Sequence, residues 1–146
     1  MIGEESKKRV LAVDDEPAVT RLLSRVLQED YEVHTAPSAE DALAAMEAFK
    51  PDLLIVDKNL PRMSGFDLVK AARSRLPQLS VIVITGAPEA LPGDTERIDV
   101  YLAKPFRSIE LVRHAVAEAF ERQRTAQERV ELQRKLDEVV AQLRRG

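Results

Sequence analysis

The chain has no cysteine among its 146 residues, which excludes disulfides and thiolate metal sites. It has no tryptophan and only four phenylalanines and two tyrosines, so it offers few platforms on which nucleic-acid bases could stack. No apolar stretch approaches the roughly 20 residues of a membrane span, and residues 1–8 lack the pattern of a signal peptide. These absences favour a cytoplasmic protein that does not bind a membrane.

A strong charge of one sign is also missing, because the net charge is only −3. Residues 121–146 hold seven Lys and Arg against five Asp and Glu, a net of +2, so the rest of the chain carries −5. An acidic globular part argues against nucleic-acid binding, and the tail is too mixed in sign to favour it. The length fits one domain with an appendage.

Short apolar runs alternate with helical patterns along the first 120 residues. The runs predict strands at 10–13, 31–36, 53–56, 81–84 and 98–103, with helices after Pro17, Ser38, Gly65 and Ser108. This alternation predicts an α/β fold with a doubly wound, five-stranded parallel sheet. The continuous apolar runs of the first, third and fourth strands fit strands that are buried on both faces.

The rhythm breaks between the fourth and fifth strands. Residues 86–97 contain two prolines and two glycines, so we expect the helix there to be shortened or irregular. We expect Asp99, just beyond this stretch, and Asp67 to be solvated. His34 and His114 have no partner at metal-ligand spacing, so we expect neither to have a functional role.

No proline or glycine occurs from Ser108 until Gly146, which predicts one long C-terminal helix. Its first part can pack on the domain through an apolar set: Ile109, Leu111, Val112, Ala115, Val116, Ala119 and Phe120. Farther on, Leu132, Leu136, Val139 and Leu143 step by 4, 3 and 4, which is a coiled-coil register. We expect residues 122–146 to form a homodimer through this helix or to fray; the alternative is a solvated linker.

Polar side chains follow the predicted strands where each one ends. Asp14 and Asp15 come after the first strand, Asp57 after the third, Thr85 after the fourth and Lys104 after the fifth. In an open parallel sheet the ligand crevice lies outside these carboxyl ends. Three acids, a hydroxyl and a lysine are therefore predicted to converge on one place.

This set of groups suits phosphoryl chemistry on a carboxylate. Clustered carboxylates resist full ionisation unless a cation joins them, and all-oxygen ligands select a hard ion such as Mg²⁺. Asp57 can then attack phosphorus as a nucleophile, while the metal and Lys104 neutralise phosphoryl oxygens. Thr85 can donate a hydrogen bond to the bound phosphoryl group.

Four motifs together make the chain resemble a response-regulator receiver domain over roughly residues 8–121. They are Val13-Asp14-Asp15-Glu16-Pro17, Asp57-Lys58-Asn59-Leu60-Pro61-Arg62-Met63-Ser64-Gly65, Ile84-Thr85-Gly86 and Tyr101-Leu102-Ala103-Lys104-Pro105-Phe106. The resemblance implies a flavodoxin-like sheet of order 2-1-3-4-5. On this basis we expect three parts: residues 1–7 form a disordered terminus, residues 8–121 form the receiver domain and residues 122–146 form a helical extension.

The resemblance also implies roles for the residues at the strand ends. Asp57 is expected to accept phosphate from a sensor histidine kinase or a phosphotransfer protein. Mg²⁺ is expected to be held by Asp14 or Asp15, by Asp57 and by the main-chain carbonyl of Asn59. No turnover of an outside substrate is expected, although the domain would catalyse its own phosphorylation and dephosphorylation.

By the same resemblance, Thr85 and Tyr101 form a switch in which the hydroxyl moves to the phosphate and the ring turns inward. The Lys104–Pro105 peptide bond is commonly cis in the family. The Pro-rich stretch departs from the family pattern and makes the usual dimerisation face doubtful. We therefore expect the switch to act on an output through the C-terminal helix.

Three other functions share parts of these features. A flavodoxin-like cofactor binder would need a Gly/Ser/Thr-rich loop after the first strand, where this chain has Asp14 and Asp15. A phosphatase of the haloacid dehalogenase type has a second acid two residues after its nucleophile, where this chain has Asn59. A non-phosphorylated structural or dimerisation receiver remains as the alternative.

Overall fold

The computed structural model describes residues 7–87 and 97–145. Five parallel strands form one sheet in the order β2-β1-β3-β4-β5. The strands are β1 (Arg9–Val13), β2 (Glu32–Ala36), β3 (Leu53–Asp57), β4 (Ser80–Thr85) and β5 (Val100–Ala103). This strand order confirms the predicted doubly wound, flavodoxin-like sheet.

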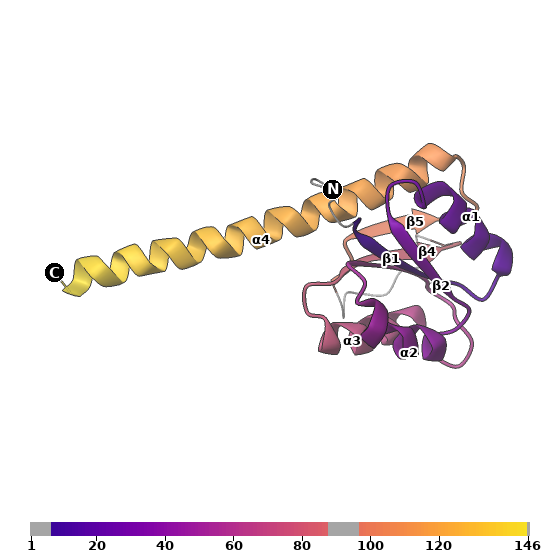
Figure 1. Ribbon diagram of the computed structural model, residues 1–146, viewed down its shortest axis with the longest axis horizontal. Coiled ribbons are helices and arrows are strands. Elements are labelled where there is room, and N and C mark those ends of the chain that lie inside the picture. The colour runs from indigo at the N-terminus through magenta and orange to yellow at the C-terminus, as the bar shows by residue number, and fades with distance from the viewer. Residues whose placement is uncertain (1–6, 88–96, 146) are drawn as a thin grey trace, which may run out of the picture.

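Helices cover both faces of the sheet (Figure 1). Helices α1 (Pro17–Leu27) and α4 (Ile109–Arg145) pack on one face, and α2 (Ala39–Phe49) and α3 (Gly65–Arg75) pack on the other. Within β3, Ile55 faces the first pair and Leu54 the second, and both are fully buried. Burial on both faces explains why the central strands have no polar alternation.

Local signals set the helix starts. Pro17 occupies the first turn of α1, where its missing N–H costs nothing. The hydroxyl oxygens of Ser38 and Ser64 accept hydrogen bonds from the main-chain N–H groups of Asp41 and Asp67, each at 3.1 Å. These caps satisfy N–H groups that the first turn of a helix leaves without partners.

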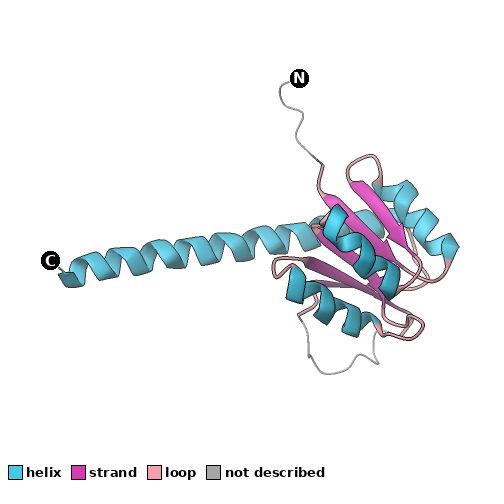
Figure 2. Cartoon of the chain, turned by 60° about the horizontal axis from the view of Figure 1, so that its bottom comes forward, coloured by secondary structure: helices cyan, strands magenta, loops and turns pink. Residues whose placement is uncertain are grey.

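Helix α4 is one unbroken helix of 37 residues, as predicted. Only its first part packs on the sheet, and the rest extends away from the domain (Figure 2). The prediction that Ile109 and Leu111 pack inward was wrong, because they are 49% and 48% exposed. The helical period places Val112 and Val116 on the sheet side and turns these two residues away.

The helix leaves the domain at the edge formed by the amino ends of the strands. There the Arg122 guanidinium donates to the carbonyl oxygen of Asp99 at 2.7 Å, and the Gln123 side chain donates to the carbonyl oxygen of Gln78. Because α4 begins after β5 and runs antiparallel to it, this exit lies at the opposite edge from the ends of the strands that carry the predicted site.

Asp99 is buried, so the expectation that it is solvated was wrong. Its carboxylate accepts from the main-chain N–H of Val81 at 2.8 Å and from the Arg73 guanidinium at 3.3 Å. Together with the Arg122 contact, these bonds join α3, β4 and α4 at the start of β5. The arginines lie far from Asp99 in sequence, which is why no local pattern predicts this burial.

Two sequence predictions lie outside the described residues. They are the disordered terminus, of which residues 1–6 are not described, and the irregular fourth helix, which falls at 88–96. Among the helices that the structure describes, none combines the length and apolar character needed to cross a membrane.

Candidate functional site

The site is built where β1, β3, β4 and β5 end. The parallel registers pair Asp57 with Ile84 and Thr85 with Ala103, so the carboxyl ends of β3, β4 and β5 lie level. Asp14 directly follows β1, and Lys104 directly follows β5. The topology therefore brings together Asp14, Asp57, Thr85 and Lys104, as the sequence predicts.

Lys104 lies at the centre of the acidic group. Its Nζ atom is 3.0 Å from Asp14 Oδ2, 3.1 Å from Asp57 Oδ2 and 2.8 Å from Glu16 Oε1. Burial alone would lower the pKa of Lys104, but hydrogen bonds to Glu16, Asp14 and Asp57 outweigh it and raise the pKa above its ordinary value. The lysine is therefore charged at neutral pH.

Asp14 is the most deeply buried acid of the site, with 1% of its surface exposed. Burial is the largest influence on its carboxyl and raises its pKa; hydrogen bonds from the Glu16 N–H and Lys104 oppose the rise without cancelling it. Its Oδ1 accepts from the Glu16 N–H at 2.9 Å, and its Oδ2 lies 3.0 Å from the Lys104 ammonium group. One cation therefore already contacts this carboxylate.

Oxygen atoms of Asp14, Glu16 and Asp57 lie within 4.8 Å of one another, close enough to share one metal ion. All three are carboxylates, and oxygen ligands of this kind are those that Mg²⁺ prefers, so the chemistry of this donor set fits the ion. Asp15 is exposed and is not part of this group, while Glu16, which we did not predict, is. The signal that could have found Glu16 is its place directly after two acids.

The loop after β3 holds Asp57 in position. The main-chain N–H of Asn59 donates to Asp57 Oδ1 at 3.2 Å, and the main-chain N–H of Gly65 donates to the Lys58 carbonyl at 2.8 Å. A Cβ atom at Gly65 would overlap the carbonyl oxygen of Asp57 and lie 3.0 Å from Cα of Lys58. Glycine is required there because α3 begins against the backbone of the acidic residue. The metal-binding role of the Asn59 carbonyl remains a prediction.

The two residues of the predicted switch lie on neighbouring strands. Thr85 is buried, and its Oγ1 accepts from the Ala87 N–H at 3.1 Å. Its carbonyl accepts from the Lys104 N–H at 2.9 Å, and the Lys104–Pro105 bond is cis. Tyr101, on β5, is 40% exposed. The threonine hydroxyl and the tyrosine ring therefore occupy different environments in this structure.

Residues 10–117 match the family described as response regulator receiver domain. The chain belongs to this family. Among its relatives, the probable transcriptional regulatory protein TcrX of Mycobacterium tuberculosis is 36% identical over 107 residues, which are 70% of this chain and 46% of that protein. The alkaline phosphatase synthesis transcriptional regulatory protein PhoP of Bacillus subtilis is 33% identical over 108 residues, 71% of this chain and 45% of that protein.

A solved structure agrees with this assignment. The chemotaxis response regulator CheY4 of Vibrio cholerae superposes with a TM-score of 0.71 at 31% identity, over 78% of this chain and 99% of that one. The chain spans less than half of the length of TcrX and PhoP. The matches to TcrX, PhoP and CheY4 cover 70%, 71% and 78% of this chain.

The raised pKa of Asp14 makes the stability of the receiver domain depend on pH. A carboxyl whose pKa is higher in the folded state stabilises the fold below its unfolded pKa, and this contribution is lost as pH rises through the folded pKa. In EDTA, we expect Asp14→Asn to raise the free energy of unfolding near pH 7.5. The gain should shrink as pH falls through the pKa of Asp14. Urea unfolding at pH 4.5 and pH 7.5 measures both effects.

Magnesium provides the control for this prediction. If Asp14 is a ligand of Mg²⁺, the ion should stabilise the wild-type receiver more than the Asp14→Asn variant. Asp41→Asn, an exposed acid of α2, should not change the response to Mg²⁺. A variant that is less stable than wild type in EDTA at pH 7.5 would contradict the expected cost of the buried charge.

Proposed function

We propose that this receiver domain accepts a phosphoryl group on Asp57 from a histidine kinase or a phosphotransfer protein. The observation that carries the proposal is the position of Asp57. Its carboxylate ends a buried strand, lies 3.1 Å from the Lys104 ammonium group and shares a possible metal site with the buried Asp14. A nucleophile, a fixed cation and a place for a second cation therefore adjoin one another.

In the proposed transfer, an oxygen of Asp57 attacks phosphorus while the bond from phosphorus to the donor nitrogen breaks and its electrons stay on the donor. The Asn59 N–H holds Asp57 Oδ1 in place, and Lys104 neutralises charge on the transferred group. Mg²⁺, when bound by Asp57, Asp14, Asp15 or Glu16 and the Asn59 carbonyl, supplies a further positive charge to the phosphoryl oxygens.

The switch follows from the groups next to Asp57. A phosphoryl group on this residue offers acceptor oxygens to the Thr85 hydroxyl, which would then leave its contact with the Ala87 N–H. We propose that the Tyr101 ring then turns inward. Helix α4 packs on β4 and β5, and the Arg122 guanidinium donates to the carbonyl oxygen of Asp99, just before β5. A movement of these strands would therefore displace the helix through these contacts. Helix α4 is therefore the proposed output element.

Intact-mass spectrometry with acetyl phosphate tests the phospho-accepting role. With Mg²⁺ we expect a gain of ~80 Da, the mass of one phosphoryl group. The gain should be absent in EDTA and in Asp57→Asn, while the exposed-acid control Asp67→Asn should behave as wild type. No gain in folded wild-type protein would reject the proposal and favour the alternative, a receiver that serves as a structural or dimerisation module without phosphorylation.

A further inference from the structure

Helix α4 carries two stripes of side chains with the same spacing. The first consists of the apolar Val112, Val116 and Ala119, which pack on the sheet, and ends at the polar, half-buried Gln123. The second consists of Leu132, Leu136, Val139 and Leu143, which are 60%, 51%, 52% and 74% exposed. Both step by 4, 3 and 4 residues, so the second repeats the first twenty residues later. The sheet covers the first stripe and leaves the second uncovered.

The two stripes face nearly opposite directions. A helix turns by about 100° per residue, so twenty residues correspond to about 200° after complete turns are subtracted. A helix lying against the second stripe would therefore run along the side of α4 that faces away from the sheet. The receiver domain would not obstruct such a helix.

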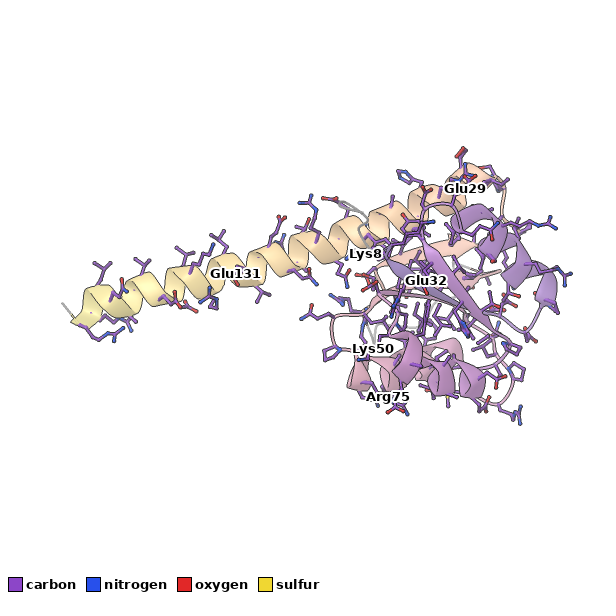
Figure 3. All side chains as sticks on the ribbon, in the orientation of Figure 1. Lys8, Glu29, Glu32, Lys50, Arg75 and Glu131 are labelled. Carbon is purple, nitrogen blue, oxygen red and sulfur yellow. The ribbon has the colours of Figure 1, made fainter. Side chains whose placement is uncertain are left out.

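Charged side chains of the extended part of α4 form ion pairs on the side of the helix opposite the second stripe. Arg134 forms ion pairs with Glu131 at 2.6 Å and with Glu138 at 2.7 Å. Arg134 lies two residues before Leu136, a rotation of about 200°, so these ion pairs lie opposite the second stripe. The four stripe positions carry no charge, since the charged residues of this stretch, Arg134, Lys135, Asp137 and Glu138, occupy other positions of the helix. The half-exposed Val140 widens the stripe. Figure 3 shows Glu131 on the extended part of α4 beyond the domain.

The occupant that fits this stripe is a second copy of the same helix. Side chains that step by 4 and 3 form holes of the same spacing between them, so two identical stripes can interlock. The flanking coiled-coil positions hold Glu128 and Lys135 on one side and Gln133 and Val140 on the other. In a parallel pair Glu128 would meet Gln133 and Lys135 would meet Val140, so no like charges meet across the interface.

We infer that two copies of the chain associate through Leu132, Leu136, Val139 and Leu143, with each receiver domain on the outer side of the helix pair. Because α4 leaves at the amino edge of the sheet, Asp57 of each copy stays at the far end, open to a phosphate donor. The stripe is shorter than two heptads, so the dimer is weak and depends on protein concentration. The pairing does not require phosphorylation.

Sedimentation velocity of the full chain tests this inference. Between about 1 and 100 μM, wild-type protein should shift from monomer to dimer. Leu136→Glu places a charge in the stripe and should keep the chain monomeric throughout this range. The matched control Ala141→Glu adds the same charge on the opposite side of the helix and should dimerise as wild type. A monomeric wild type, or a Leu136→Glu variant that still dimerises, would overturn the inference.

Two further measurements separate this inference from the phospho-accepting role. The gain in mass with acetyl phosphate should be equal in wild type, Leu136→Glu and Ala141→Glu, because Asp57 lies at the other end of the domain. Circular dichroism should show equal folding of the receiver domain.

Mixtures of charge variants test the orientation of the two helices. A mixture of Leu136→Glu with Leu136→Lys should recover the dimer if the helices are parallel. A mixture of Leu136→Glu with Val139→Lys should recover it if they are antiparallel. Recovery in neither mixture would count against pairing through these side chains.

Discussion

Replacing Lys104 by Met should lower the rate of phosphorylation by about 100- to 1000-fold, the cost of losing one preorganised charge contact to a transition state. The methionine keeps much of the side-chain volume and removes only the charge that lies 3.1 Å from Asp57 Oδ2. The rate of mass gain with acetyl phosphate and saturating Mg²⁺ measures this loss. Lys70→Met, which changes an exposed lysine of α3, should leave the rate unchanged.

Mg²⁺ should raise the free energy of unfolding of Lys104→Met more than that of the wild-type protein. The raised pKa of Lys104 means that its contribution is fully present at neutral pH and is lost only as pH rises through that pKa. Without it, the buried Asp14 and Asp57 lack a cation, so the free energy of unfolding in EDTA should fall by about 3 kcal/mol. Mg²⁺ should recover more stability in this variant than in wild type. A rate of phosphorylation by acetyl phosphate within threefold of wild type would reject the proposed role of Lys104 in neutralising the transferred group.

Gly65→Ala should destabilise the receiver domain by about 1–3 kcal/mol, because the added Cβ overlaps main-chain atoms that cannot rotate away. The atoms it meets are the Asp57 carbonyl group and Cα of Lys58, so relief must move Asp57, the proposed phosphoryl acceptor. Urea unfolding should therefore show a lower midpoint, and the rate of mass gain with acetyl phosphate should fall as well.

Gly86→Ala is the matched control, since a Cβ at Gly86 would meet nothing within 4 Å. Both substitutions are glycine to alanine beside the same site, so they differ mainly in the space available. Equal free energies of unfolding of the two variants would contradict the prediction, because they would mean that the start of α3 can move away from the backbone of β3 without loss of stability. The overlap predicts that only the Gly65 variant loses stability and phosphorylation together.

The sequence was sufficient to predict the strands and helices among the described residues and the convergence of polar side chains at one edge of the sheet. The places of Asp14, Asp57 and Thr85 where strands end follow from continuous apolar runs, because a strand buried on both faces admits few polar side chains. Once the sheet is parallel, the residues after those runs must lie at one edge. The convergence of Asp14, Asp57, Thr85 and Lys104 therefore depends on topology that the alternation of elements already specifies.

The tertiary structure decided what depends on distance across the fold. Of the acids after β1, we predicted Asp14 or Asp15 and not Glu16 as a metal ligand. The turn after β1, however, places Glu16, not Asp15, 2.8 Å from Lys104. Asp99 is buried because Arg73 and Arg122 reach it from helices that are distant in sequence. Such contacts are non-local, so no local pattern contains them.

Helix α4 shows both sides of this division. The absence of proline and glycine after Ser108, together with the 4-3-4 spacing, determined a long helix with an apolar stripe from Leu132 to Leu143. Only the folded chain decided that the sheet covers the first stripe, that the helix leaves the domain near Gln123 and that the second stripe faces away. The spacing of residues fixes directions relative to a helix axis, whereas packing against the sheet fixes where those directions point.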